Sequence, residues 1–250
     1  MMIAAGIVKS AGSKTPPMMI AVGIAATIVG CDPSTELDVD HQRQETQCGP
    51  RLEFQPINRY FGSFVWAQAR EESVVLVNFD CTGTYIRTTA QPYLILTAGH
   101  CVELGATAQV TFNFELDADG PEETLEGVTV EQSTEPDYAL IALSNNPGVE
   151  PTSLSTQITE NLTLIQHPIG QPKVIAEGHL SDHSPRLLFY TDLDTLVGSS
   201  GAGILNSDGL LIGVHTLGDC TPDGGTNGGW TIESIIQTSE RLGPEDLEDC

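Results

Sequence analysis

The sequence has few basic and few aromatic residues. Lys and Arg make up only 10 of its 250 residues, against 34 Asp and Glu, so the formal net charge is -24 at pH 7. A surface of this charge repels phosphate backbones and anionic lipid headgroups. We therefore expect no nucleic-acid partner. The acidic residues are scattered through every segment after Cys31, which favours a soluble anionic surface over a dedicated cation site.

Long amphipathic helical patterns are nearly absent. From Val65 onward the chain has short β-rich runs separated by Gly, Pro and Asp, which is typical of an all-β barrel or sandwich. The expected strands are 74–79, 82–87, 93–97, 109–114, 124–132, 138–143, 162–167, 174–180, 187–190, 203–206 and 210–215. The one expected helix is 234–241, near the C-terminus. With 40% hydrophobic residues the chain can bury a core of one catalytic-sized domain.

Acidic residues are missing from the first thirty residues. This segment carries Lys9 and Lys14 and ends in the apolar run 18–30, which fits a signal-peptide core and is too short for an ordinary membrane span. The run closes on Ile-Val-Gly-Cys31, which resembles the bacterial lipobox, whose cysteine is lipidated. We expect residues 1–30 to be a lipoprotein-type signal peptide. A plain secretory signal and a buried helix are the alternatives, and Met18 is an alternative start.

Residues 31–47 form a polar segment. It has five acidic residues and no aromatic one, and only Leu37 and Val39 are apolar, so it cannot pack a core. We expect a tether between a lipid-modified Cys31 and a folded domain over residues 48–250. The protein would then be exported and anchored in the envelope of a bacterial cell, where disulfides persist. Secretion without an anchor is the alternative.

Three short segments carry residues suited to acyl transfer. His100 follows the apolar strand in Leu-Thr-Ala-Gly-His-Cys, and an imidazole can take up and return a proton near neutral pH. Asp137 opens the buried run Asp-Tyr-Ala-Leu-Ile and can accept an imidazole N–H. Ser200 lies in Gly-Ser-Ser-Gly, where the tight backbone lets its hydroxyl and nearby N–H groups converge on one carbonyl. Alone, each has an ordinary interpretation: a strand cap or metal ligand, a turn aspartate, and a linker serine.

In this chain order, the three segments resemble the chymotrypsin-like (trypsin-like) serine peptidases. The resemblance runs from about Cys48 to Leu242 and is to the bacterial branch that includes glutamyl endopeptidases, exfoliative toxins and lysyl endopeptidases. It implies two orthogonal six-stranded antiparallel β-barrels with a short C-terminal helix. His100 and Asp137 would lie in the first barrel and Ser200 in the second, with the active site between them.

The resemblance also implies roles for these residues. Ser200 would be the nucleophile, His100 the general base and acid, and Asp137 the carboxylate that orients the imidazole. The N–H groups of Gly198 and Ser200 would form the oxyanion hole. No metal or organic cofactor is expected. His167, in a further segment that resembles the family, is interpreted as a structural histidine rather than a second base.

Two disulfides are implied by the same resemblance. Cys81 matches the family cysteine that bridges to the one after the histidine, here Cys101. Cys48 and Cys220 resemble a bridge of the lysyl branch. Cys250 would remain unpaired or exchange into that second pair, because sequence alone does not fix connectivity.

The specificity pocket gives mixed signals. Thr195 and His215 match the glutamyl branch, and a hydroxyl and an imidazole can bind a substrate carboxylate. Asp194 complicates this interpretation, since a carboxylate near that position selects Arg or Lys in trypsin-type pockets. Thr195 and His215 could also be generic features of the branch. Ser199 stands where zymogen-activated relatives have an aspartate, so that activation switch is absent.

The combined hypothesis is an exported, monomeric serine endopeptidase that acts on proteins or peptides, with an acidic P1 residue as one possible preference. Its contact with a membrane would be limited to the N-terminal lipid. A catalytically silent protease-fold binding module and an esterase with the same triad are the alternative functions.

Overall fold

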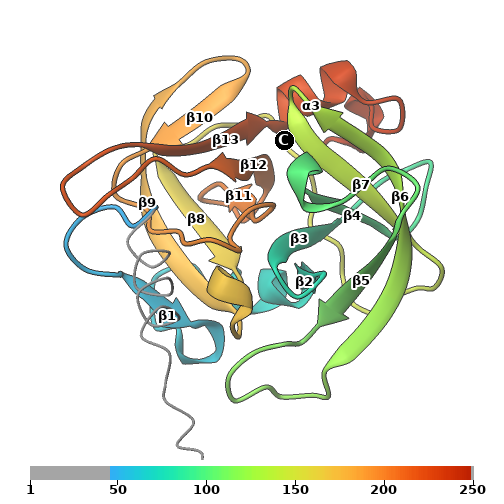
Figure 1. Ribbon diagram of the computed structural model, residues 1–250, viewed down its shortest axis with the longest axis horizontal. Coiled ribbons are helices and arrows are strands. Elements are labelled where there is room, and N and C mark those ends of the chain that lie inside the picture. Colours follow the sequence, from blue (N-terminus) through green and yellow to red (C-terminus); the bar gives the residue numbers. More distant parts are fainter. Residues whose placement is uncertain (1–45, 249–250) are drawn as a thin grey trace, which may run out of the picture.

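Two β-barrels lie side by side in the computed structural model, which describes residues 46–248 (Figure 1). The first barrel closes in the order β2-β3-β4-β7-β6-β5. Its strands are β2 (Val74–Val77), β3 (Cys81–Ile86), β4 (Leu94–Thr97), β5 (Thr107–Phe112), β6 (Glu123–Thr134) and β7 (Asp137–Leu143). All of its strand pairs are antiparallel.

The second barrel is also a closed antiparallel ring, because β8 pairs with both β9 and β11. Its strands are β8 (Asn161–Gln166), β9 (Val174–His183), β10 (Leu187–Tyr190), β11 (Gly203–Leu205), β12 (Leu211–Leu217) and β13 (Asn227–Thr231). The short strand β1 (Phe54–Pro56) extends this sheet along β9. The expectation of two six-stranded antiparallel barrels is therefore confirmed.

Successive side chains of a strand point into the barrel and out of it. Each barrel therefore has a core of its own, and outward-facing side chains form a further core between the barrels. On β4, Ile95 packs inside the first barrel, whereas Leu94 and Leu96 belong to a cluster with Leu205 and Leu211 of the second barrel. Neighbouring side chains of a strand point to opposite faces, so an uninterrupted apolar run is what a strand buried on both faces requires. The shared core fixes the two barrels against each other.

The helices and two strands differ from the sequence-based expectations. Helix α3 (Ile232–Thr238) begins and ends before the predicted 234–241. It begins early because Thr231 caps it by accepting the Ser234 N–H. Helix α2 (Ala67–Arg70), β1 and β13 were not predicted. Strand β13 contains Gly229, where a Cβ atom would lie 2.1 Å from the Val214 carbonyl oxygen. Only glycine fits where the two backbones approach this closely. Because glycine has a low strand propensity, the sequence did not predict this strand.

Two disulfides join distant segments and confirm both implied pairings. Cys48 is bonded to Cys220, and Cys81 on β3 is bonded to Cys101. Disulfides persist in oxidising compartments, which indicates an extracytoplasmic location. The expected signal peptide, the lipidated Cys31, most of the tether and Cys250 lie outside the described residues. Across residues 46–248, no helix has the length and apolarity needed to span a membrane.

Candidate active site

The end of β4 and the start of β7 place His100 beside Asp137. These strands are antiparallel neighbours, with Thr97 opposite Ala139, so the residue that opens β7 faces the turn that follows β4. Asp137 Oδ2 lies 2.7 Å from His100 Nδ1, and Asp137 Oδ1 accepts the His100 backbone N–H at 3.1 Å. This hydrogen bond raises the pKa of His100. The carboxylate favours a proton on Nδ1 and leaves Nε2 to exchange protons.

Gly99 and Gln132 shape the turn that carries His100. A Cβ atom on Gly99 would lie 2.1 Å from the Ser133 carbonyl oxygen and 2.8 Å from Asp137 Oδ1, so only glycine fits. Gln132 Nε2 donates to the carbonyls of Gly99 and Val102, at 2.7 Å each. The turn is thus held from β6, which keeps the imidazole in place.

Three carbonyl groups of the Ser200 loop accept hydrogen bonds from residues outside the loop. Val197 O accepts the Ile169 N–H at 2.6 Å. Gly198 O accepts the Thr82 hydroxyl at 2.9 Å, and Ser200 O accepts the Thr82 backbone N–H at 2.9 Å. Fixed carbonyls restrict the peptide planes, and therefore the directions of the N–H groups on the same planes.

Gly198 and Ser200 of this loop have N–H groups without an acceptor among residues 46–248. Ser199 and Gly201 donate to backbone carbonyls at 2.9 and 2.8 Å. The N–H groups of Gly198 and Ser200 make no such bond to any group among residues 46–248. Gly198 has φ +92°, and a Cβ atom there would lie 2.8 Å from Ile169 N, so the loop requires glycine at this position. Backbone N–H groups without a protein acceptor are the type of donor from which an oxyanion hole is built.

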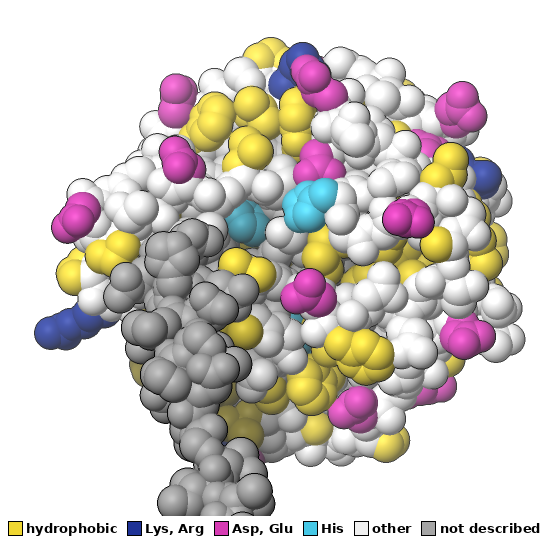
Figure 2. Space-filling view, in the orientation of Figure 1, with side chains coloured by type: hydrophobic (Ala, Val, Ile, Leu, Met, Phe, Trp, Pro, Cys, Tyr) yellow, Lys and Arg dark blue, Asp and Glu magenta, His cyan; other side chains and the backbone are white. Residues whose placement is uncertain are grey.

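One cavity of about 300 Å³ joins these groups. His100 from the first barrel and Gly198 and Ser200 from the second all line it. Its remaining lining residues are Val77, Asn78, Asp80, Cys81, Cys101 and Val197. On the face drawn in Figure 2, histidine side chains reach the surface near its centre, and acidic side chains are spread singly around them. The cavity lies on the boundary between the barrels, where the resemblance had placed the active site.

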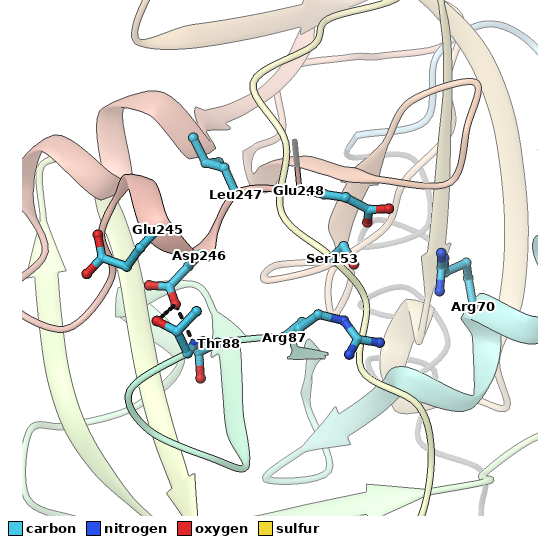
Figure 3. A pocket seen from close by; sticks show the side chains of 9 residues that line it. Arg70, Arg87, Thr88, Ser153, Glu245, Asp246, Leu247 and Glu248 are labelled. Atoms are coloured by element: carbon cyan, nitrogen blue, oxygen red, sulfur yellow. Dashed lines mark hydrogen bonds between the residues drawn. The ribbon is translucent and has the colours of Figure 1, made fainter. Parts of the chain in front are cut away.

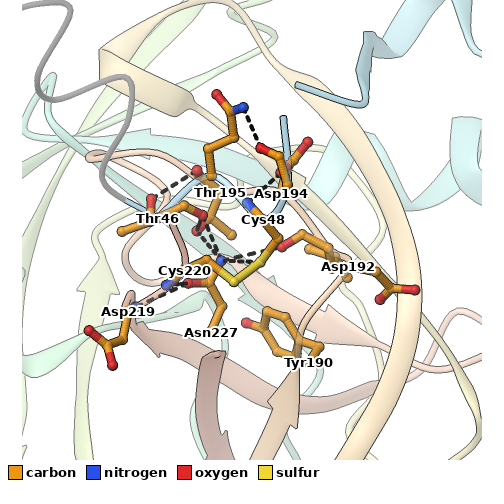
Figure 4. Close-up of a disulfide and its surroundings, with 12 residues drawn as sticks. Thr46, Cys48, Tyr190, Asp192, Asp194, Thr195, Asp219, Cys220 and Asn227 are labelled. Carbon is orange, nitrogen blue, oxygen red and sulfur yellow. Dashed lines mark hydrogen bonds between the residues drawn. A yellow bond between two sulfur atoms is a disulfide. The ribbon is translucent and has the colours of Figure 1, made fainter. Parts of the chain in front are cut away.

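Asp194 and Thr195 face the N-terminal segment of the domain. The Asp194 carboxylate accepts the N–H groups of Cys48 at 2.8 Å and Glu53 at 2.5 Å, and the residue is only 2% exposed. Thr195 Oγ1 accepts from Asn227 Nδ2 at 3.0 Å, beside the Cys48–Cys220 disulfide (Figure 4). Both Asp194 oxygens are thus engaged with backbone, which does not support the sequence-based assignment of this carboxylate to the pocket wall.

His215 is buried against Tyr190. Its Nδ1 lies 2.6 Å from the Tyr190 hydroxyl and 3.1 Å from the Gly228 carbonyl. Burial lowers the pKa of His215 to about 4, so the ring is neutral at physiological pH. The Tyr190 hydroxyl can donate to Nδ1, which places the ring proton on Nε2, whereas the Gly228 carbonyl can only accept from a proton on Nδ1, so the two contacts favour opposite tautomers.

A second cavity, of about 360 Å³, lies away from these groups and is lined by none of the three candidate catalytic residues. Figure 3 shows Arg70 and Arg87 beside it, together with residues of the C-terminal segment. Asp246 accepts the Thr89 N–H at 2.7 Å and the Thr89 hydroxyl at 2.9 Å. These contacts attach the C-terminal segment to the first barrel.

Comparison with known families agrees with this geometry. Residues 81–214 match the model of the trypsin-like peptidase domain. The chain belongs to this family. The matched range contains the three candidate catalytic residues and parts of both barrels.

Solved structures show the same fold as this trypsin-like domain. A Glu endopeptidase is similar with a TM-score of 0.54 and 22% identity, over 74% of this chain and 93% of that chain. An inactive form of Rv3671c from M. tuberculosis H37Rv has a TM-score of 0.58 and 16% identity, over 78% and 99%. Deg5 has a TM-score of 0.54 and 20% identity, over 72% and 93%. No curated protein sequence matches the chain.

Several residues of the trypsin-like site were missed by sequence reasoning. Thr82, Ile169 and Gln132 hold the loops that carry Ser200 and His100, and Tyr190 contacts His215. Their roles depend on pairings between segments distant in sequence, and none of them carries a local signal. His167, interpreted as structural, is fully buried with its Nδ1 3.0 Å from the Gln171 carbonyl, and burial lowers its pKa to about 3.

Proposed function

We propose that the protein is an exported, monomeric serine endopeptidase that hydrolyses peptide bonds through an acyl-enzyme. One observation carries this proposal. The Asp137 carboxylate binds both Nδ1 and the backbone N–H of His100, and His100 lines one cavity with Ser200 and Gly198. A base held in one tautomer, a hydroxyl and two available N–H donors are the components that acyl transfer needs.

The mechanism follows from these positions. Ser200 Oγ attacks the peptide carbonyl carbon while its proton passes to His100 Nε2, and the carbonyl oxygen takes the negative charge. The N–H groups of Gly198 and Ser200 stabilise that oxyanion. The C–N bond then breaks and the His100 proton goes to the leaving amine, which forms the ester on Ser200. A water molecule repeats the attack, with His100 again taking and returning the proton, and frees the carboxylic acid.

For specificity, we propose that the pocket prefers an acidic P1 side chain. In the tautomer that accepts from Tyr190, neutral His215 can donate its Nε2 proton to a carboxylate. The buried Thr195 hydroxyl bonds to Asn227 and to the Thr46 carbonyl, so Thr195 would support this wall beside His215. Asp194 would support the pocket from behind through its bonds to the N-terminal segment and would not contact the substrate. The fold similarity to a structure described as a Glu endopeptidase is consistent with this proposal.

The most informative experiment is sequencing of the products made from a proteome-derived peptide library, with Ser200→Ala as the matched control. We expect internal cleavage that is lost in the variant, with Glu or Asp enriched before the cut. Cleavage only after Arg or Lys would refute the acidic preference and leave the peptidase intact. Turnover of esters without any peptide cleavage would favour the esterase alternative.

At the N-terminus, we propose a lipoprotein signal over residues 1–30 with lipid on Cys31. Mass spectrometry of the protein from its native host would show a mature chain that begins at a diacylglycerol-modified Cys31. A mature N-terminus without lipid would indicate a secreted protein instead.

A further inference from the structure

Thr82 lies on β3 of the first barrel, yet three of its four hydrogen bonds go to the second barrel. Its N–H donates to Ser200 O at 2.9 Å, and its hydroxyl donates to Gly198 O at 2.9 Å. The same hydroxyl accepts the His167 N–H at 3.0 Å, and Thr82 O accepts the Thr97 hydroxyl at 2.7 Å. The side chain is fully buried. Thr82 therefore joins the barrels directly beneath the Ser200 loop.

The two carbonyls that Thr82 holds belong to the same residues that supply the two free N–H groups. The Gly198 N–H lies on the same peptide plane as Val197 O, and the Gly198 carbonyl lies on the next plane, so holding both planes fixes the φ and ψ of Gly198 and the direction of its N–H. Gly198 needs such support more than most residues, since glycine has the widest conformational freedom. Its preceding carbonyl, Val197 O, is held separately by Ile169 N–H.

We propose that Thr82 is a positioning residue of the oxyanion hole, acting across the barrel boundary through its hydroxyl. This inference rests on the proposed function. The hydroxyl donates to Gly198 and accepts from His167 at the same time, which no aliphatic side chain can do. Valine at this position would keep the shape but leave a buried carbonyl and a buried N–H unpaired, and the loop would relax to satisfy them.

The test compares Thr82→Val with Thr84→Val on the same strand. The Thr84 hydroxyl is also buried but has no hydrogen-bond partner within residues 46–248, so T84V removes an equal group without touching the loop. Steady-state kinetics are measured on a peptide that the wild type cleaves, with the competent fraction counted by active-site titration. Thr82→Ser restores the hydroxyl, and Thr82→Ala replaces T82V if that variant does not fold.

Loss of one oxyanion donor reduces kcat by about 10²- to 10³-fold, so displacement of one should reduce it about 10- to 100-fold in T82V. KM should change little, because the bond acts in the transition state. The affinity of a peptide aldehyde, whose hemiacetal oxygen occupies the hole, should fall in proportion to kcat/KM. T84V and T82S should stay within about threefold of the wild type.

Three results would overturn the inference while leaving the peptidase itself intact. These are a kcat of T82V or T82A equal to that of T84V, a loss confined to KM, and a T82S variant as impaired as T82V. A wild type without peptidase or aldehyde-binding activity would instead refute the proposed function, and the role of Thr82 with it.

Discussion

Replacement of Asp137 by Asn tests how His100 is prepared for catalysis. The Asp137 carboxylate lies 2.7 Å from His100 Nδ1 and accepts the His100 backbone N–H at 3.1 Å. An asparagine can still accept the backbone N–H through its oxygen, but its NH₂ group then faces Nδ1 as a donor. The imidazole must take the tautomer with its proton on Nε2, which cannot accept the Ser200 proton. A change of this kind lowers kcat by about 10⁴-fold in a Ser-His-Asp site.

The pH profile gives a second readout for the same variant. The hydrogen bond from Asp137 is the main cause that raises the pKa of His100. In D137N this pKa should fall, so the residual activity should persist to lower pH than wild-type activity does. Both quantities come from kcat/KM measured between about pH 4 and pH 9, with active sites titrated at each pH.

Glu135 offers the control for charge alone. Its carboxylate pairs with Arg186 at 3.0 Å on the exposed surface and does not contact His100. E135Q removes the same charge two residues away, and its kcat should stay within about twofold of the wild type. A D137N variant that keeps a tenth of wild-type kcat, or an E135Q variant that loses as much as D137N, would refute the argument.

Three other variants test buried charged groups of the domain. Lys173 is fully buried, and its Nζ lies 2.6 Å from Glu71 Oε2 and 3.5 Å from Glu115 Oε2. K173M should therefore lower the unfolding free energy, measured in urea, by about 3–5 kcal/mol. A loss below about 1 kcal/mol would contradict this prediction. Burial raises the pKa of Glu71 from 4.5 to about 7, so the folded state favours the protonated acid and stability should fall as pH rises across that range. In E71Q the unfolding free energy should decrease less with rising pH than in the wild type. An equal dependence on pH in the two proteins would contradict this prediction. D194N leaves one backbone N–H facing an amide NH₂, so it should lower the free energy of unfolding in urea by about 1–3 kcal/mol. The ratio of cleavage after Glu to cleavage after Arg should not change. A change in that ratio would place Asp194 in the pocket.

Local patterns in the sequence predicted an all-β barrel or sandwich, and the family resemblance of three segments added the two-barrel arrangement and the candidate triad. Apolar runs such as Leu94–Thr97 are buried on both faces, and that burial is visible in composition alone. The Cys81–Cys101 and Cys48–Cys220 pairings came from the family resemblance and are confirmed by the structure. Strand β13 was not predicted because its glycine residues suggest a turn. In the structure, Gly229 is needed because the neighbouring backbone lies too close for a Cβ atom.

Tertiary hydrogen bonds account for what the sequence could not predict at the site. The Asp194 carboxylate is bound by the N–H groups of Cys48 and Glu53, which lie far earlier in the chain. Thr82 follows a disulfide cysteine, and nothing local shows that its hydroxyl reaches Gly198. The first contact depends on how the N-terminal segment packs on the second barrel, and the second depends on how the two barrels dock, and no periodicity in the sequence encodes either.

The most direct test of the central claim is mass-spectrometric mapping of the adduct formed with an alkyl fluorophosphonate. This reagent reacts with a serine only when a base and an oxyanion hole activate the hydroxyl. Correctly oxidised wild-type protein should carry one adduct, on Ser200. The adduct should be absent in Ser200→Ala and strongly slowed in His100→Ala. A correctly folded wild type without an adduct, or with the adduct on another serine, would contradict the assignment of Ser200 as the nucleophile.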